Sequence, residues 1–146
     1  MEKTIHAKVL LVDDEEDFIK TLAQRLEMRG LKVTGVTRGE DAVALTARQS
    51  FDAIVIDLAM PGMDGLETLK KIKESQPEAE IIMLSGQGTV KSGIEAMKLG
   101  AEDFLEKPVD MQELLTKINE MRHKRILVLE KQSIEEIDNI LKSKSW

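Results

Sequence analysis

The chain has 146 residues, of which 42% are hydrophobic and 33% charged, and this balance predicts one soluble, globular domain with room for a helical extension. The absence of cysteine excludes disulfide scaffolds, thiolate metal sites and thiol nucleophiles. The net charge of −6 argues against direct nucleic-acid binding, because Lys and Arg are needed to neutralise phosphates.

Five short apolar runs alternate with segments of helical spacing over the first 110 residues. The first run, in MEKTIHAKVLLVDD, is too short for a signal peptide or a membrane span, so we expect a cytoplasmic protein without membrane contact. The expected strands are 7–12, 31–36, 52–57, 80–84 and 102–107. Their nearly continuous hydrophobicity is typical of strands that helices cover on both faces. The alternation predicts an α/β fold with a doubly wound, five-stranded parallel sheet.

Polar side chains stand at the ends of four of the five expected strands. They are Asp13 and Asp14 after the first strand, Asp57 after the third, Ser85 after the fourth, and Lys107 with Pro108 after the fifth. A single strand-end Asp is typical of turns and helix caps. Right-handed crossovers, however, bring the carboxyl ends of parallel strands to one edge, where ligands bind in such folds. The joint occurrence of these residues therefore favours a functional site at that edge.

The residue types at this edge suit phosphoryl chemistry. Three carboxylates are the ligands that Mg²⁺ prefers, whereas Glu15, Glu16 and Asp17 are expected in the first turn of the next helix. Lys107 would hold a phosphoryl oxygen, or pair with Asp57 when the site is empty, and Ser85 would donate a hydrogen bond to another phosphoryl oxygen. Asp57 would then act as the nucleophile that forms an acyl phosphate.

Two further motifs strengthen this interpretation: MPGMDG (60–65) after Asp57, and GAEDFLEKP (100–108) around Lys107. Over roughly residues 7–125 the chain resembles the receiver domain of two-component response regulators. The segment SGQGTVKSGIEAMKLGAEDFLEKPV is similar to receivers of bacterial enhancer-binding activators. The resemblance implies a flavodoxin-like sheet of order 2-1-3-4-5. It also implies a phosphoprotein that takes its phosphoryl group from a sensor histidine kinase or a histidine phosphotransfer protein.

The resemblance also implies a metal site and a tuning position. Mg²⁺ would be held by Asp14, Asp57 and the backbone carbonyl of Ala59, and Asp13 would act mainly through metal-bound water. In the family, the positions two residues after the phosphoacceptor and two after Ser85 tune the attack of water on the acyl phosphate. Here they are Ala59 and Gln87, and because Ala59 cannot orient a water molecule, Gln87 is the side chain expected to do so.

A conformational switch is the third implication of the resemblance. Ser85 would move toward the phosphoryl group and Phe104 would turn inward, although Phe104 also suits an ordinary core position. This movement would bias the surface of the fourth helix, fifth strand and fifth helix, which is a candidate homodimer surface. The Lys107-Pro108 bond is expected to be cis.

The carboxy-terminal segment is predicted to be helical. A long helix should begin near Asp110, and the capping-box spacing of Ser133 to Glu136 predicts a second, short helix. We assign 1–125 to the receiver domain and 126–146 to a helical extension. The extension either folds back on the domain or forms a dimer-forming or partner-binding helix.

Two other functions are compatible with parts of the pattern. A magnesium phosphohydrolase would also use an aspartyl nucleophile, but such enzymes carry a second Asp where this chain has Ala59. A flavin- or nucleotide-binding module would need a Gly-rich or hydroxyl-rich first loop, and DDEED would repel phosphates without a metal. We therefore predict a signalling phosphoacceptor whose chemistry is limited to its own phosphorylation and autodephosphorylation.

Overall fold

The computed structural model describes residues 6–60, 62–86 and 90–143. In this part of the chain five strands alternate with five helices. The strands are β1 (Lys8–Val12), β2 (Lys32–Val36), β3 (Ala53–Asp57), β4 (Ile81–Ser85) and β5 (Asp103–Glu106). The helices are α1 (Glu16–Glu27), α2 (Gly39–Thr46), α3 (Gly65–Ser75), α4 (Val90–Lys98) and α5 (Met111–Ser143). Each strand boundary lies within one residue of its predicted position.

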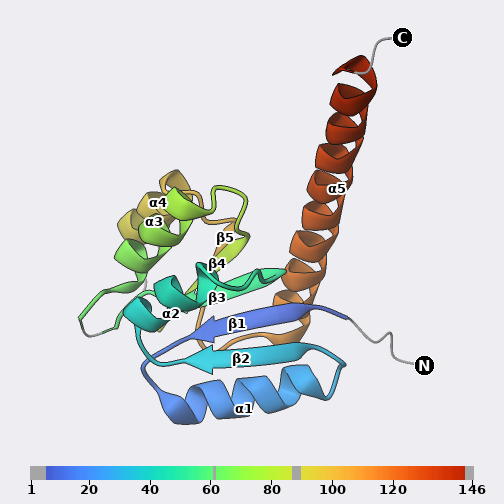
Figure 1. Ribbon diagram of the computed structural model, residues 1–146. Helices are drawn as coiled ribbons and strands as arrows, with labels where there is room; N and C mark the ends of the chain where they lie inside the picture. The colour runs from blue at the N-terminus through green and yellow to red at the C-terminus, as the bar shows by residue number, and fades with distance from the viewer. Residues whose placement is uncertain (1–5, 61, 87–89, 144–146) are drawn as a thin grey trace.

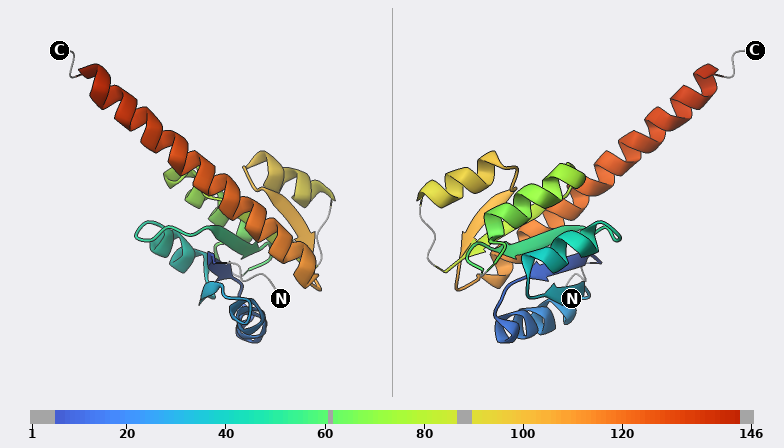
Figure 2. Two further views of the ribbon diagram at one scale, coloured as in Figure 1. Left: turned by 90° about the vertical axis from the view of Figure 1, so that its right-hand side faces the viewer. Right: turned by 60° about the vertical axis from the view of Figure 1, so that its left-hand side comes forward.

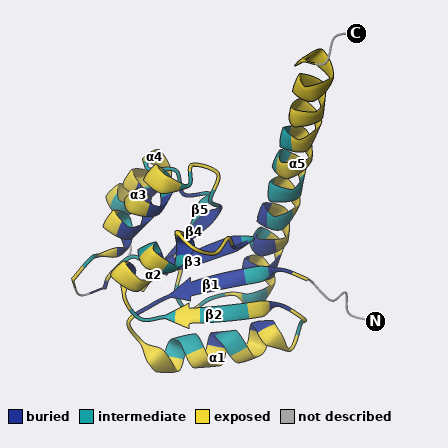
Figure 3. Cartoon of the chain, in the orientation of Figure 1, coloured by how far each residue is buried: buried dark blue, intermediate teal, exposed yellow. Residues whose placement is uncertain are grey.

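All five strands are parallel and lie in the order β2-β1-β3-β4-β5, which confirms the predicted doubly wound, flavodoxin-like sheet (Figure 1). Because successive side chains of a strand point to opposite faces, each strand contributes to two cores. Val9 and Leu11 of β1 pack in the core that includes α1 and α5, whereas Leu10 and Val12 pack in the core that includes α2, α3 and α4. Burial on both faces explains the near-continuous hydrophobicity of β1, β3 and β4 (Figure 3).

Helix α5 is one unbroken helix of 33 residues, so the prediction of a second helix beginning at Ser133 is wrong. The segment 111–143 contains neither Gly nor Pro, so no residue breaks the helix before Ser133. The capping-box spacing of Ser133 to Glu136 therefore lies inside a continuous helix. The helix does not fold back on the domain, because its carboxy-terminal half extends beyond the sheet in all views (Figures 1 and 2).

Only the first half of α5 belongs to the core. Its buried residues are Leu114, Leu115, Ile118 and Met121, all before position 122. The second half leaves apolar side chains in solvent, including Ile134 and Ile137 at 66% and 58% exposure. Among the described residues, no helix is both long enough and apolar enough to cross a membrane.

Candidate functional site

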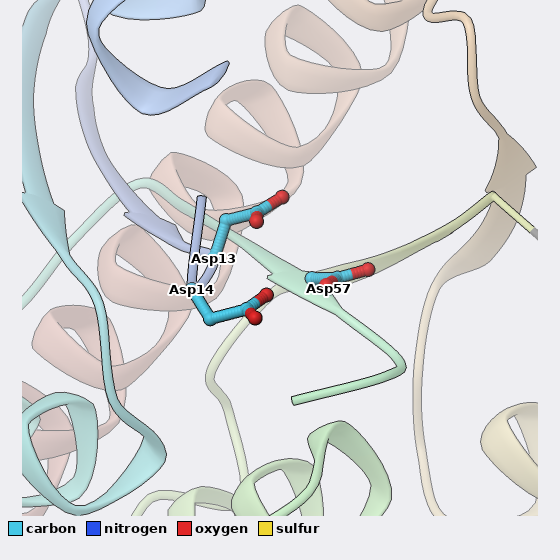
Figure 4. A group of neighbouring side chains, drawn as sticks. All are labelled: Asp13, Asp14 and Asp57. Carbon is cyan, nitrogen blue, oxygen red and sulfur yellow. The ribbon is translucent and has the colours of Figure 1, made fainter. Parts of the chain in front are cut away.

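Three carboxylates meet at the carboxyl edge of the sheet (Figure 4). Val12 of β1 is in register with Ile56 of β3, so the residues that follow β1 lie beside Asp57, the last residue of β3. Ligand oxygens of Asp13, Asp14 and Asp57 all lie within 4.8 Å of one another. Such a set of hard oxygen donors fits a divalent cation such as Mg²⁺, which the resemblance implies.

The Asp57 carboxylate is held in an environment that opposes its charge. Its residue is 5% exposed, and burial together with the neighbouring charge of Asp13 raises its pKa from 3.8 to about 6. Lys107 opposes this rise without cancelling it. The three carboxylates of the site therefore outweigh the ammonium of Lys107, and a bound cation would neutralise the excess negative charge.

Lys107, the residue after β5, supplies the cation of the site. Its Nζ lies 2.7 Å from Asp13 Oδ2 and 3.7 Å from Asp57 Oδ1. The predicted pairing with Asp57 is present, but the closer partner is Asp13, which sequence reasoning did not foresee. Burial alone would lower the pKa of Lys107, but the hydrogen bond and charge of Asp13, with the charge of Asp57, raise it above the ordinary value. The ammonium is therefore protonated at neutral pH.

Both carboxylate oxygens of Asp13 have hydrogen-bond donors. Oδ2 accepts from Lys107, and Oδ1 accepts from the backbone N–H of Glu15 at 2.9 Å. Glu15 is the N-cap of α1, so this bond joins the end of β1 to the start of that helix. Asp14, in contrast, is exposed, and the acidic run therefore divides between buried and solvent-facing positions.

An aromatic ring completes the surroundings of the lysine. The Lys107 Nζ lies over the ring of Phe18, 4.1 Å from its centroid. Phe18 is in the first turn of α1, half-buried and packed against the core beside that helix. Nothing in the residue spacing of the sequence indicated the contact between Phe18 and Lys107.

Ser85 and Lys107 are held side by side by the backbone. Ser85 ends β4 and is 2% exposed, and the Lys107 N–H donates to its carbonyl oxygen at 2.8 Å. The Lys107-Pro108 peptide is cis, as the resemblance implies. Phe104 is half-buried and contributes to an open groove of about 570 Å³ along α4. Gln87 lies outside the described residues.

Asp64 and Gly65 fix the start of α3 after the loop that follows Asp57. Asp64 is the N-cap of α3, and its Oδ1 accepts from the Glu67 N–H at 2.9 Å. A side chain at Gly65 would place Cβ only 2.3 Å from the Asp57 carbonyl oxygen, so this approach requires glycine. Ala59 is exposed in the same loop and offers no polar side chain to the site.

Comparisons with known proteins agree with this site. Residues 9–119 match the family described as response regulator receiver domain. The C4-dicarboxylate transport transcriptional regulatory protein DctD of Pseudomonas aeruginosa is 37% identical over 130 residues, which are 87% of this chain and 28% of DctD. The chain spans about a quarter of the length of this and the similar relatives it matches.

Two solved structures are similar throughout the fold. A response regulator receiver domain protein from Clostridium thermocellum has a TM-score of 0.80 at 31% identity, over 84% of this chain and 98% of that one. A response regulator from Burkholderia pseudomallei, solved with a phosphorylated aspartic acid and a calcium ion, has a TM-score of 0.71 at 29% identity. The match covers 89% of this chain and 82% of that one. The chain therefore belongs to the response regulator receiver domain family, whose members are signalling domains of two-component systems.

Proposed function

We propose that the chain accepts a phosphoryl group on Asp57 in a Mg²⁺-dependent reaction and signals through a changed protein-interaction surface. The observation that carries this proposal is the position of Asp57, buried at the end of β3 between two carboxylates and one ammonium. Receiver domains interact with histidine kinases, and here a kinase or a histidine phosphotransfer protein would be the donor. The phosphorylated aspartic acid of the Burkholderia relative supports the same chemistry.

In this reaction an Asp57 carboxylate oxygen attacks phosphorus with its electron pair. The bond from phosphorus to the donor's imidazole nitrogen breaks, and that nitrogen keeps the bonding pair and takes up a proton from solvent. Lys107 pairs with a phosphoryl oxygen, and Ser85 donates its hydroxyl to another. The high pKa of Lys107 keeps its charge available throughout.

A bound Mg²⁺ would neutralise the carboxylates and the incoming phosphoryl oxygens. Asp14 and Asp57, with the Ala59 carbonyl, are its proposed ligands. The two hydrogen bonds to the Asp13 carboxylate support a more indirect role for that residue, through metal-bound water. The acidic donor set fits the family, whose members generally bind Mg²⁺ in an acidic pocket.

The proposed output is the surface of α4, β5 and α5. Phosphorylation draws Ser85 toward the phosphoryl group, and Phe104 turns into the space beneath α4. The groove there already exposes apolar side chains, with Val90 at 82% and Ile94 at 51%. We propose that this surface, together with the exposed apolar half of α5, forms a homodimer. We assign 1–125 to the phosphoacceptor unit and 126–146 to this extension, and direct nucleic-acid binding is not part of the proposal.

Phosphorylation with acetyl phosphate tests the proposal without a kinase. The chain is incubated with MgCl₂ and acetyl phosphate, and intact-mass and peptide mass spectrometry locate the product. We expect one phosphoryl group per chain on Asp57, and none when EDTA removes the metal or when Asp57 is replaced in Asp57→Asn. The matched control is Asp52→Asn at the opposite end of β3, which should still be phosphorylated on Asp57. Continuous hydrolysis of assorted phosphate esters would instead indicate a phosphohydrolase, and absence of a product at Asp57 would refute the proposal.

Loss of the phosphoryl group tests the tuning position. Because Gln87 is the side chain proposed to orient the attacking water, Gln87→Ala should slow dephosphorylation of the isolated phosphoprotein, whereas a substitution at exposed Glu74 should leave the rate unchanged. An unchanged rate in Gln87→Ala would show that this side chain does not orient the attacking water.

A further inference from the structure

We propose that Phe18 is a positioning residue for the phosphoryl site: the face of its ring holds the Lys107 ammonium over the pocket. This inference rests on the proposed function, because it concerns the cation that would receive the phosphoryl oxygens. It goes beyond the residues that the resemblance assigns, none of which is aromatic apart from Phe104.

Three groups surround the ammonium in the described structure. Asp13 Oδ2 is at 2.7 Å, Asp57 Oδ1 is at 3.7 Å, and the centroid of the Phe18 ring is at 4.1 Å. The ring therefore lies well within the distance at which its negative face attracts a cation. The lysine side chain is 15% exposed, so little water competes with these groups.

The Phe18 ring restricts the position of the ammonium in a way that the carboxylates alone do not. Lysine ends in a point charge on a flexible stem of four carbons, and one short hydrogen bond to Asp13 leaves two donors free to turn toward water. A flat ring beside the ammonium excludes water from that side and attracts the charge without accepting a directed hydrogen bond. The ammonium is thus held near both carboxylates, yet it can transfer its hydrogen bond to a phosphoryl oxygen.

The backbone fixes both partners of this contact. Phe18 is in the first turn of α1, which the hydrogen bond from Glu15 N–H to Asp13 ties to the end of β1. Lys107 is tied to the end of β4 by its own N–H, which donates to Ser85. An aliphatic residue at position 18 would fill the same volume beside the core but would present no negative face to the lysine.

The test changes the charge distribution of the Phe18 ring while nearly preserving its shape. Phenylalanines with one, two or three fluorines are introduced at position 18 of the full chain, since fluorine withdraws electron density from the ring face. The rate of phosphorylation by acetyl phosphate is then measured at saturating Mg²⁺. Phe51 is the matched control, because Lys8 Nζ lies over its ring at 5.0 Å from the centroid, at the opposite end of the sheet.

We expect the rate to fall stepwise with fluorination at position 18, by about threefold to tenfold for the trifluoro ring, and to stay unchanged with the same series at position 51. Phe18→Leu should slow the reaction to a similar extent. An equal rate across the Phe18 series would overturn the inference, even if the wild-type chain is phosphorylated on Asp57.

A second measurement does not depend on phosphorylation. Protons on Cε of Lys107 should resonate upfield in the NMR spectrum, because the ring current of Phe18 shields them, and they should return to the ordinary lysine position in Phe18→Leu. If these resonances do not move, the contact is absent and the inference fails. If they move but the wild-type chain takes no phosphoryl group, the proposed function fails and the positioning of Lys107 stands.

Discussion

At the scale of single residues, the main feature of the site is an electrostatic conflict at Asp57. Burial and the charge of Asp13 raise its pKa to about 6, so the ionised form is disfavoured in the folded chain. Stability associated with the neutral acid is complete below the unfolded value of 3.8 and is lost as the pH rises through about 6. At pH values above about 6 the folded protein therefore carries the unfavourable charge of Asp57, which the proposed cation would neutralise.

Removing the charge of Asp57 should therefore stabilise the metal-free protein. At pH 7.5 in EDTA, Asp57→Asn should raise the free energy of unfolding by about 1–3 kcal/mol, measured by urea denaturation. At pH 4 the difference should nearly vanish, because the wild-type carboxyl is then neutral when folded. A lower stability of Asp57→Asn at pH 7.5 would show that the pairing of Asp57 with Lys107 outweighs the conflict.

The same pKa should govern the proposed binding of a cation at Asp57. Mg²⁺ requires the ionised carboxylate, so its affinity should fall by about tenfold between pH 7 and pH 5, as one proton competes for Asp57. Isothermal titration calorimetry at the two pH values measures this change. An affinity independent of pH over this range would place the metal away from Asp57.

At the scale of elements, polar contacts anchor the middle of α5 on the amino-terminal edge of the sheet, opposite the phosphoryl site. Lys124 Nζ lies 3.0 Å from Glu102 Oε1 and 3.9 Å from Glu80 Oε2, where Glu80 is buried just before β4. Burial and the adjoining Glu102 raise the pKa of Glu80 to about 7. Further along α5, Arg125 Nη1 lies 3.6 Å from Asp52 Oδ1.

This anchor makes the stability of the fold sensitive to pH near neutrality. The folded pKa of Glu80 is above its unfolded value of 4.5, so stability is lost as the pH rises through about 7. Glu80→Gln should be more stable than the wild type at pH 8, by about 1–3 kcal/mol, and by less at pH 5.5. Urea denaturation at both pH values measures this, with exposed Glu74→Gln as the control. Equal differences at the two pH values would rule out titration of Glu80 as the cause.

At the scale of the whole molecule, the dominant feature is the exposed half of α5. Leu127, Ile134 and Leu141 are spaced by seven residues and are 52%, 66% and 61% exposed, and Ile137 lies on the same stripe. This spacing is that of a seam between two helices. A second copy of the chain, arranged side by side, would bury the stripe.

Dimer formation should therefore depend on the stripe and increase on phosphorylation. Ile137→Asp should shift the protein to monomer in sedimentation velocity, whereas Asn139→Asp, on the outer side of the same turn, should not. Acetyl phosphate and Mg²⁺ should increase the dimer fraction of the wild type. A wild-type chain that stays monomeric with and without phosphorylation would refute the proposed homodimer.

Much of the fold could be predicted from the sequence, because continuous apolar runs and helical spacing record which faces are buried. The site residues at strand ends followed from topology alone, since parallel strands deliver Asp13, Asp57, Ser85 and Lys107 to one edge. The prediction of a second helix at Ser133 failed for a local reason. Ser133 and Glu136 have the spacing of a capping box, but a cap forms only where the helix is interrupted. The spacing of polar residues does not reveal whether such an interruption exists.

Contacts between side chains from distant segments could not be predicted. Phe18 and Lys107 are far apart in sequence, and their meeting depends on how α1 tilts against the end of β5. The same holds for Glu80 and Lys124, whose pairing requires the path of α5 across the sheet. Periodicity assigns a residue to a face, but not to a partner on that face.

The continuity of α5 has a mechanical consequence for anything joined to its end. A straight helix carries rotation as well as position, so each residue inserted into its exposed half would turn an attached domain by about 100° and advance it by about 1.5 Å. Seven added residues would leave the attached domain about 20° from its original orientation, whereas two or five would turn it to roughly the opposite side of the helix. Fusions to this chain should accordingly gain and lose function with a periodic dependence on linker length.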